Sequence, residues 1–223
     1  MAMKPWDHFL LTSFCLADFQ RLGIADFSCQ TMKTFLALPL ALGLLLGLAK
    51  PGRSEVLLNL EREFYSVNVA RNAPLFPQLL RASPITQKSV RYTGYTSAPI
   101  KWDFKYRLDA ITGQCRIVSS RTFLNAKITM PRIVGASDRQ INAFNRFYAA
   151  LLRHEMGHYA IAGETAFAID YELTAMPPMQ TCAQLEQQAN SKAYERLQES
   201  YTKVLTYDEL TRHGRLQGAV LQE

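Results

Sequence analysis

The chain has 223 residues, of which 48% are hydrophobic, so it is long enough to bury the core of one domain. Charged residues make up 20% and the formal net charge is +6, yet no run of five Lys or Arg occurs, which argues against nucleic-acid binding. A moderate positive charge fits a basic soluble surface, or association with an anionic cell envelope.

Residues 32–49 have the features of a secretory signal peptide. A short basic start at Met32 is followed by an apolar run that ends in small residues at Ala49. We expect cleavage after Ala49; the run is short for a membrane span, and an uncleaved anchor is the alternative. Residues 1–31 are interpreted as a mis-assigned start or a disordered leader, which leaves 50–223 as the folded domain.

Removal of this leader would leave two cysteines, Cys115 and Cys182. Export places them in an oxidising compartment, so we expect one disulfide between them, with two separate buried thiols as the alternative. Cys115 lies in a predicted strand and Cys182 in the first turn of a predicted helix. The bond would therefore attach that helix to the sheet.

The sequence from about residue 63 to residue 133 favours strands. Residues 100–108 alternate apolar and polar side chains, as a half-buried strand does. The other segments with strand character are 64–69, 90–96, 114–118 and 123–130, and a short helix is expected over 74–80.

The pattern becomes helical after Ser137. The four residues from Ser137 fit a capping box, and apolar residues then recur at helical spacing until the helix must end before Pro177. Gly163 allows a bend in this helix. A second capping sequence at Thr181 predicts another helix to about Leu205. Strands followed by helices predict an α+β fold: an antiparallel β-sheet, a long helix, and a second helix antiparallel to the first.

The stretch His-Glu-Met-Gly-His at 154–158 lies within the long predicted helix. Four-residue spacing places the imidazoles of His154 and His158 about 40° apart on one helix face. Both can then bind one zinc ion through nitrogen. Glu155 has the position of the general base that accepts a proton from a zinc-bound water. The alternative is a metal-free pair of histidines on an amphipathic helix.

A catalytic zinc ion usually takes a third protein ligand and leaves one position for water. His213 is the first candidate, because it is the only other histidine after the signal peptide. Glu164 faces away from His158 on a regular helix and would need a break in that helix. Asp170 and Glu172 are further alternatives.

Several parts of the sequence resemble a bacterial family of predicted secreted zinc-dependent proteases, a family of unknown function placed in the HExxH zincin superfamily. The resemblance covers about residues 65–222. It is carried, in order, by Trp102, Cys115, Pro131, the motif at 154–158, Cys182 and the ending Tyr207-Asp208-x-x-Thr211-x-His213-Gly214. This ending is the most specific part, and the resemblance implies that His213 belongs to the site.

The residues of this ending receive provisional roles. With His213 as a ligand, Asp208 or Thr211 would hold its other ring nitrogen. Tyr207 is assigned a catalytic role, stabilising the developing oxyanion, by analogy with tyrosines in other zinc peptidases.

The sequence therefore predicts that residues 50–223 form a zinc metallopeptidase-like domain, secreted or periplasmic, with Zn²⁺ as cofactor. The expected partner is a peptide or protein substrate, with association with the cell envelope, no nucleic acid, and a monomeric state. Two alternatives remain open: a non-catalytic zinc-binding envelope protein, and a zinc hydrolase acting on peptidoglycan peptides or amides. A closed four-ligand site would favour the first alternative, and an open cleft would favour a hydrolase.

Overall fold

The computed structural model describes residues 53–222, and the predictions for residues 1–31 and 32–49 lie outside this range. All described residues belong to one compact unit. The elements are β1 (Arg53–Asn68), α1 (Leu75–Ala82), β2 (Thr86–Gln87), β3 (Val90–Arg91), β4 (Tyr95–Ser97), β5 (Ile100–Leu108), β6 (Cys115–Val134), α2 (Asp138–Thr174), α3 (Cys182–Thr211) and a 3₁₀ turn (Arg215–Gln217).

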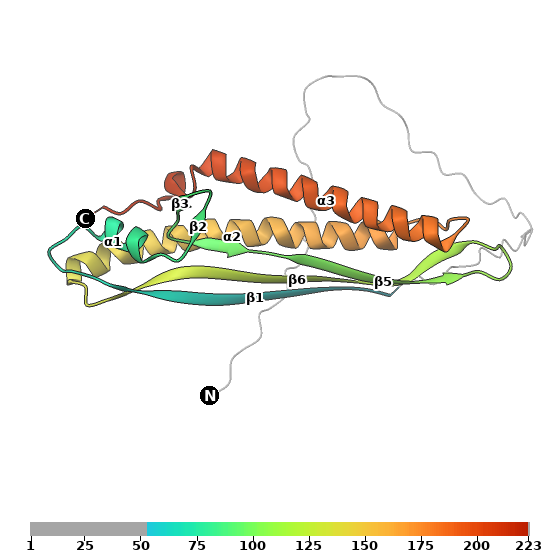
Figure 1. Ribbon diagram of the computed structural model, residues 1–223, viewed down its shortest axis with the longest axis horizontal. Coiled ribbons are helices and arrows are strands. Elements are labelled where there is room, and N and C mark those ends of the chain that lie inside the picture. The colour runs from blue at the N-terminus through green and yellow to red at the C-terminus, as the bar shows by residue number, and fades with distance from the viewer. Residues whose placement is uncertain (1–52, 223) are drawn as a thin grey trace, which may run out of the picture. The chain divides into compact units, whose positions relative to one another are not determined.

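The fold is α+β, as predicted, with a four-stranded sheet on one side of two long helices (Figure 1). Its central strand is β6. β1 pairs with β6 in parallel, whereas β4 and β5 pair antiparallel with the other edge of β6. The expectation of a purely antiparallel sheet is therefore wrong. Alternation along a strand does not encode pairing direction, and the long connection through α1 lets β1 and β6 run the same way.

β6 is one strand of 20 residues rather than the two strands expected. The polar stretch around Ser120 interrupts the apolar alternation, which is why the sequence suggested a gap. In the structure Ser120 is buried, and its hydroxyl donates to Asp170 Oδ1 on α2 at 2.6 Å. A polar partner on the facing helix thus allows the strand to continue through this stretch.

α2 is 37 residues long and begins at the predicted capping box, where the Ser137 and Gln140 side chains each bond to the other residue's backbone N–H. The helix continues through Gly163 without the bend that the sequence allowed. α3 begins after Thr181, whose hydroxyl accepts from the Gln184 N–H, and it returns alongside α2. Within residues 53–222, none of the helices combines the length and apolar character that a transmembrane segment needs.

The predicted disulfide between Cys115 and Cys182 is present, with a Cα–Cα distance of 5.0 Å. It joins the first residue of β6 to the first residue of α3. Cys115 also exchanges two backbone hydrogen bonds with Met179, at 2.8 and 2.9 Å. These interactions attach the α2–α3 connection to the sheet, and the bond is consistent with a secreted protein.

The core lies between the inner face of the sheet and the helices. The largest cluster comes from β1, β6, α1 and α2, and its buried members are Val67, Val69, Leu75, Leu79, Ile128, Met130, Phe144, Phe147 and Leu151. This cluster packs around the half of α2 that leads into the 154–158 motif. It therefore holds that turn of the helix in place relative to the strands.

Candidate metal centre

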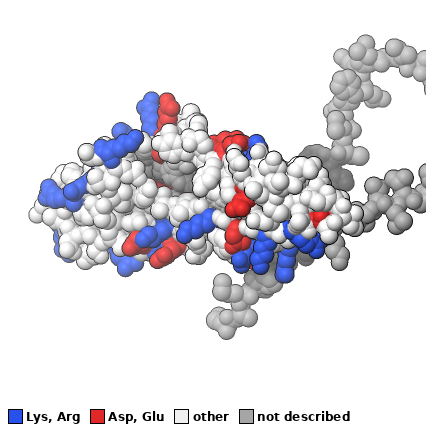
Figure 2. Space-filling model, turned by 45° about the vertical axis from the view of Figure 1, so that its right-hand side comes forward, with Lys and Arg blue, Asp and Glu red and all other residues white. Residues whose placement is uncertain are grey.

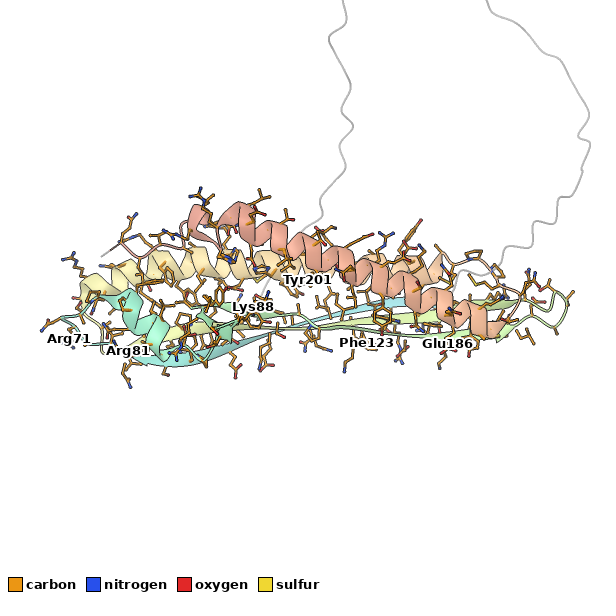
Figure 3. All side chains as sticks on the ribbon, turned by 45° about the horizontal axis from the view of Figure 1, so that its top comes forward. Arg71, Arg81, Lys88, Phe123, Glu186 and Tyr201 are labelled. Atoms are coloured by element: carbon orange, nitrogen blue, oxygen red, sulfur yellow. A yellow bond between two sulfur atoms is a disulfide. The ribbon has the colours of Figure 1, made fainter. Side chains whose placement is uncertain are left out.

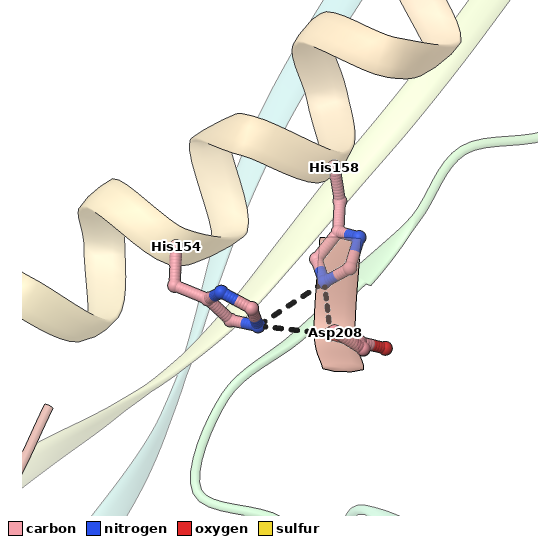
Figure 4. A group of neighbouring side chains, drawn as sticks. All are labelled: His154, His158 and Asp208. Carbon is pink, nitrogen blue, oxygen red and sulfur yellow. Dashed lines mark hydrogen bonds and ion pairs between the residues drawn. The ribbon is translucent and has the colours of Figure 1, made fainter. Parts of the chain in front are cut away.

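Three ligand atoms from two helices meet at one point (Figure 4). The Nε2 atoms of His154 and His158 are 3.2 Å apart, and Asp208 Oδ1 on α3 lies 3.1 Å from each. In a tetrahedral site with ligands about 2.0–2.1 Å from zinc, neighbouring ligand atoms lie roughly 3.3–3.4 Å apart. Among residues 53–222, this trio is the group of His, Cys, Asp or Glu side chains close enough to share an ion.

Asp208 Oδ1 is a buried oxygen that makes no hydrogen bond within the described part of the chain. The nearest polar atoms to this oxygen are imidazole nitrogens, and a cation shared with them would balance its buried charge. Burial opposes ionisation of Asp208, but the two imidazoles hold the pKa of its carboxyl well below its usual range. The group is therefore a charged ligand, and His₂Asp is a donor set that suits zinc.

The electrostatics around His154 also favour a cation. Burial tends to lower the pKa of this imidazole, but the neighbouring carboxylates of Asp208 and Glu155 raise it above its usual value. The potential that attracts a proton to His154 equally attracts a metal ion.

His154 is oriented through its second ring nitrogen. Nδ1 lies 3.0 Å from Gln217 Oε1, which can only accept, so this contact assigns the ring proton to Nδ1 and leaves the Nε2 lone pair for a metal. Gln217 is held in turn because its Nε2 donates to the Tyr207 hydroxyl at 3.0 Å. Such outer interactions set the tautomer and the orientation of metal-binding histidines.

Tyr207 packs against both histidines. Its ring is stacked on His154 at 5.0 Å and stands edge-on to His158 at 5.1 Å. Its hydroxyl donates to the His154 carbonyl at 3.3 Å and lies against Gly157, where a β-carbon would be 2.1 Å from it. The structure thus places the Tyr207 hydroxyl on the backbone of α2, where it supports the histidines. Tyr207 is not among the residues that line the cleft described below.

The end of α3 wraps around His154. Arg212 and His213 both have φ of 50°, and Gly214 follows with φ of 79°. A β-carbon on Gly214 would lie 3.0 Å from His154 Cγ, so the close approach and the positive φ both require glycine there. Thr211 Oγ1 accepts from the Gly214 N–H at 3.3 Å. The ending that carries the family resemblance is therefore the segment that encloses His154.

His213 lies beside the trio rather than in it. Its Nδ1 is 3.5 Å from Asp208 Oδ1, its side chain is 57% exposed, and its ring contacts Tyr92 at a centroid distance of 5.9 Å. The place that sequence reasoning assigned to His213 is occupied by Asp208, which the sequence suggested only as its supporting partner. The sequence predicted the end of this helix at about Leu205 and so placed both residues beyond it, whereas α3 runs to Thr211, with Asp208 on the helix and His213 after its end.

The remaining alternatives for a third ligand lie elsewhere. Glu164 is on the surface, with its side chain 70% exposed. Asp170 is buried against the hydroxyl of Ser120, and Glu172 forms an ion pair with Arg196. None of these three carboxylates belongs to the metal-sized group of the described residues.

Glu155 is only 4% exposed and is held by the sheet. The Thr96 hydroxyl on β4 lies 2.7 Å from Glu155 Oε2 and 3.0 Å from the Glu155 carbonyl oxygen, and donates to them. Gly94 lies against the other carboxylate oxygen, since a β-carbon there would be 2.8 Å from Oε1. Burial raises the pKa of the Glu155 carboxyl, an effect that the Thr96 hydrogen bond partly offsets. Sequence reasoning missed Thr96 and Gly94, because no motif marks them.

The trio and Glu155 lie in a cleft of about 540 Å³. One wall is the β2–β3 hairpin and β4, and the other is the C-terminal half of α3. Lys88, near the hairpin turn, and Tyr201, on α3, are labelled in Figure 3. β4 pairs only with β6 among the described strands, so its other edge is free for hydrogen bonding.

Comparison with known families places the chain in one of them. A family model described as a bacterial protein of unknown function (DUF922) matches residues 62–214. The chain belongs to the DUF922 family. No curated protein and no solved structure matches it.

The DUF922 match includes the trio, Glu155, Thr96 and the disulfide, and it ends at Gly214, against which His154 packs. Gln217, which orients His154, lies just beyond it. All three residues of the candidate metal centre therefore lie within the segment that the family model matches.

Proposed function

We propose that this chain is a zinc-dependent metallopeptidase that acts outside the cytoplasm. The observation that carries the proposal is the triangle of His154 Nε2, His158 Nε2 and Asp208 Oδ1, with edges of 3.1–3.2 Å, next to the Glu155 carboxylate in one cleft. Three protein ligands leave one position for water or substrate, as in catalytic rather than structural zinc sites.

His154, His158 and Asp208 would hold the ion, which when bound lowers the pKa of its water and polarises a carbonyl oxygen. Glu155 would accept the proton of the attacking water and deliver it to the leaving amine. Its buried position in the same cleft as the trio supports this role. Thr96 holds one carboxylate oxygen, so the group keeps one orientation.

The free edge of β4 supports a peptide as the substrate. An extended peptide can add to a sheet edge through main-chain hydrogen bonds. Tyr95 and Thr96 of this strand line the same cleft as the trio. The backbone of a peptide bound along β4 would run parallel or antiparallel to this strand and past the metal centre.

The test combines metal analysis with cleavage of a broad peptide library by oxidised protein. We expect about one zinc per chain, and loss of cleavage with a chelator that zinc restores. Glu155→Gln should keep zinc and lose nearly all turnover. Glu164→Gln, on the exposed side of the same helix, is the matched control and should keep both.

The outcomes separate the alternatives. Folded protein that binds no zinc, or a Glu155→Gln variant with full activity, would refute the proposal. Zinc-loaded protein that cleaves peptidoglycan peptides but no library peptide would identify the peptidoglycan hydrolase. Zinc-loaded protein inert toward both would identify the non-catalytic alternative.

A further inference from the structure

Among the described residues, no element covers the face of the sheet that points away from α2 and α3 at the end that carries the β5–β6 turn. In β5, Trp102 and Phe104 pack toward the helices, so the alternate residues of this strand point the other way. Lys101 and Lys105 are among these outward residues, and both are exposed. Residues of β6 and β1 that pair with outward residues of a neighbouring strand point outward as well: Arg121 pairs with Asp103 and Glu55, and Arg116 pairs with Arg107.

This open end, which we call the basic sheet face, is strongly positive. Its charged members are Arg53, Lys101, Lys105, Arg107, Arg116 and Arg121, with Glu55 and Asp103 as the acidic ones. Asp103 forms an ion pair with Arg121 at 3.0 Å. The carboxylate of Asp109, in the turn after β5, is attracted electrostatically to Arg116. Figure 2 shows Lys and Arg side chains along the lower edge of the molecule, with Asp and Glu side chains among them. Six basic residues against Glu55, Asp103 and Asp109 leave three positive charges in excess on this surface.

The basic sheet face also carries apolar side chains. Leu57 on β1 is 42% exposed and lies opposite Phe123 on β6, which is half-buried. The Arg121 guanidinium lies 5.6 Å from the Phe123 ring centre. Basic side chains around exposed apolar groups suit an interface that is anionic at its surface and apolar beneath it, since long basic side chains can extend toward charged headgroups.

The position of the apolar run in the sequence also favours an interface with an anionic surface and an apolar interior. The apolar run that ends at Ala49 stops four residues before Arg53, which begins β1 within the basic sheet face. If the run is an uncleaved anchor, the chain leaving it enters β1 at Arg53, within the basic sheet face.

We propose that the basic sheet face docks on an anionic phospholipid bilayer. A polybasic protein surface is attracted to such a membrane, and each Lys or Arg close to it adds to the attraction. The metal cleft lies between α2, α3 and the hairpin, on the helix side of the sheet. Docking through the opposite face would leave the cleft open to soluble substrates. This inference does not depend on catalysis.

The test is vesicle co-flotation of oxidised residues 48–223, which form one compact unit of the chain. This chain lacks most of the apolar run, so binding would report the sheet face. We expect binding to vesicles with 30–40% phosphatidylglycerol (roughly a bacterial level of anionic lipid), little binding to pure phosphatidylcholine, and loss of binding as salt rises. Lys101→Glu with Lys105→Glu should lower partitioning by about tenfold or more.

The matched control is Lys203→Glu with Arg139→Glu, which changes the net charge equally on the two long helices and should leave partitioning nearly unchanged. A cooperative urea-unfolding transition in each variant verifies folding. Equal losses in the two double variants, equal binding to both vesicle types, or no binding at low salt would overturn the proposal. Tighter binding to duplex DNA than to the anionic vesicles would instead identify a site for soluble polyanions.

Discussion

The hydroxyl of Tyr207 occupies the space that a side chain on Gly157 would need. A β-carbon on Gly157 would lie 2.1 Å from the hydroxyl oxygen and 2.4 Å from Cζ. The glycine inside the His-Glu-Met-Gly-His motif is thus explained by packing: it lets a residue of α3 stack on both histidines of α2. This contact joins α2 to α3 beside His154, His158 and Asp208, the candidate metal ligands.

Gly157→Ala should therefore displace Tyr207 and loosen the metal centre. We expect a loss of about 1–3 kcal/mol in the free energy of unfolding, as for overpacked sites, together with weaker zinc binding. Gly163→Ala, on the same helix, is the matched control. A β-carbon there meets nothing within 4 Å, so it should stabilise the helix by up to about 1 kcal/mol. Urea unfolding of both variants measures the difference, and equal effects would contradict the packing argument.

The zinc affinities of Asp208→Ala and His213→Ala test which of the two residues is the third ligand. Asp208→Ala should weaken zinc affinity by more than about 100-fold, because loss of an outer interaction alone costs about 10–100-fold. His213→Ala should change the affinity by about tenfold or less, since its ring lies outside the trio. Competition with a chromophoric chelator gives both values. The reverse ranking would restore His213 as the ligand.

Thr96 should raise kcat/KM by holding the Glu155 carboxylate in one orientation. Thr96→Val removes the hydroxyl that holds Glu155 Oε2 while keeping the shape of the side chain. A hydrogen bond to a charged group is worth about 1.5–3 kcal/mol, so kcat/KM should fall by about 10–100-fold. Zinc content should not change, and Thr96→Ser should restore most activity. A Thr96→Val enzyme with unchanged kcat/KM would exclude this positioning role.

The disulfide should contribute strongly to stability. It closes a separation of 67 residues, for which chain entropy gives about 4 kcal/mol. Oxidised, denatured protein should show no thiol at Cys115 or Cys182, and the double serine variant should unfold at a clearly lower urea concentration. Titratable thiols at these two positions in exported protein would contradict the pairing.

Tyr65 should make the domain less stable at alkaline pH. Burial raises the pKa of its phenol from 10.0 to about 12, and its hydroxyl donates to the Thr93 carbonyl at 2.9 Å. The unfolded chain releases this proton near pH 10 while the folded chain keeps it, so this contribution to stability is present below pH 10 and is lost as the pH rises to about 12. The free energy of unfolding should fall more steeply in that window for the wild type than for Tyr65→Phe. Identical slopes would show that Tyr65 titrates normally.

Local signals were enough to predict several features. The capping box at Ser137, the strand over 100–108 and the two long helices follow from residue spacing, because helix and strand periodicity are properties of neighbouring residues. The disulfide followed from counting, since export leaves Cys115 only Cys182 as a partner. The placement of His154 and His158 on one helix face is likewise set by their spacing.

Only the tertiary structure decided the rest, because it depends on which distant segments meet. Asp208 reaches the histidines because α3 returns along α2 with Tyr207 against Gly157, a fit that no spacing in the chain expresses. Thr96 reaches Glu155 because β4 pairs with β6 beside α2. The parallel pairing of β1 with β6 and the charge gathered on the open sheet face arise in the same way: alternation tells which residues share a face, but strand order and direction decide which faces lie side by side.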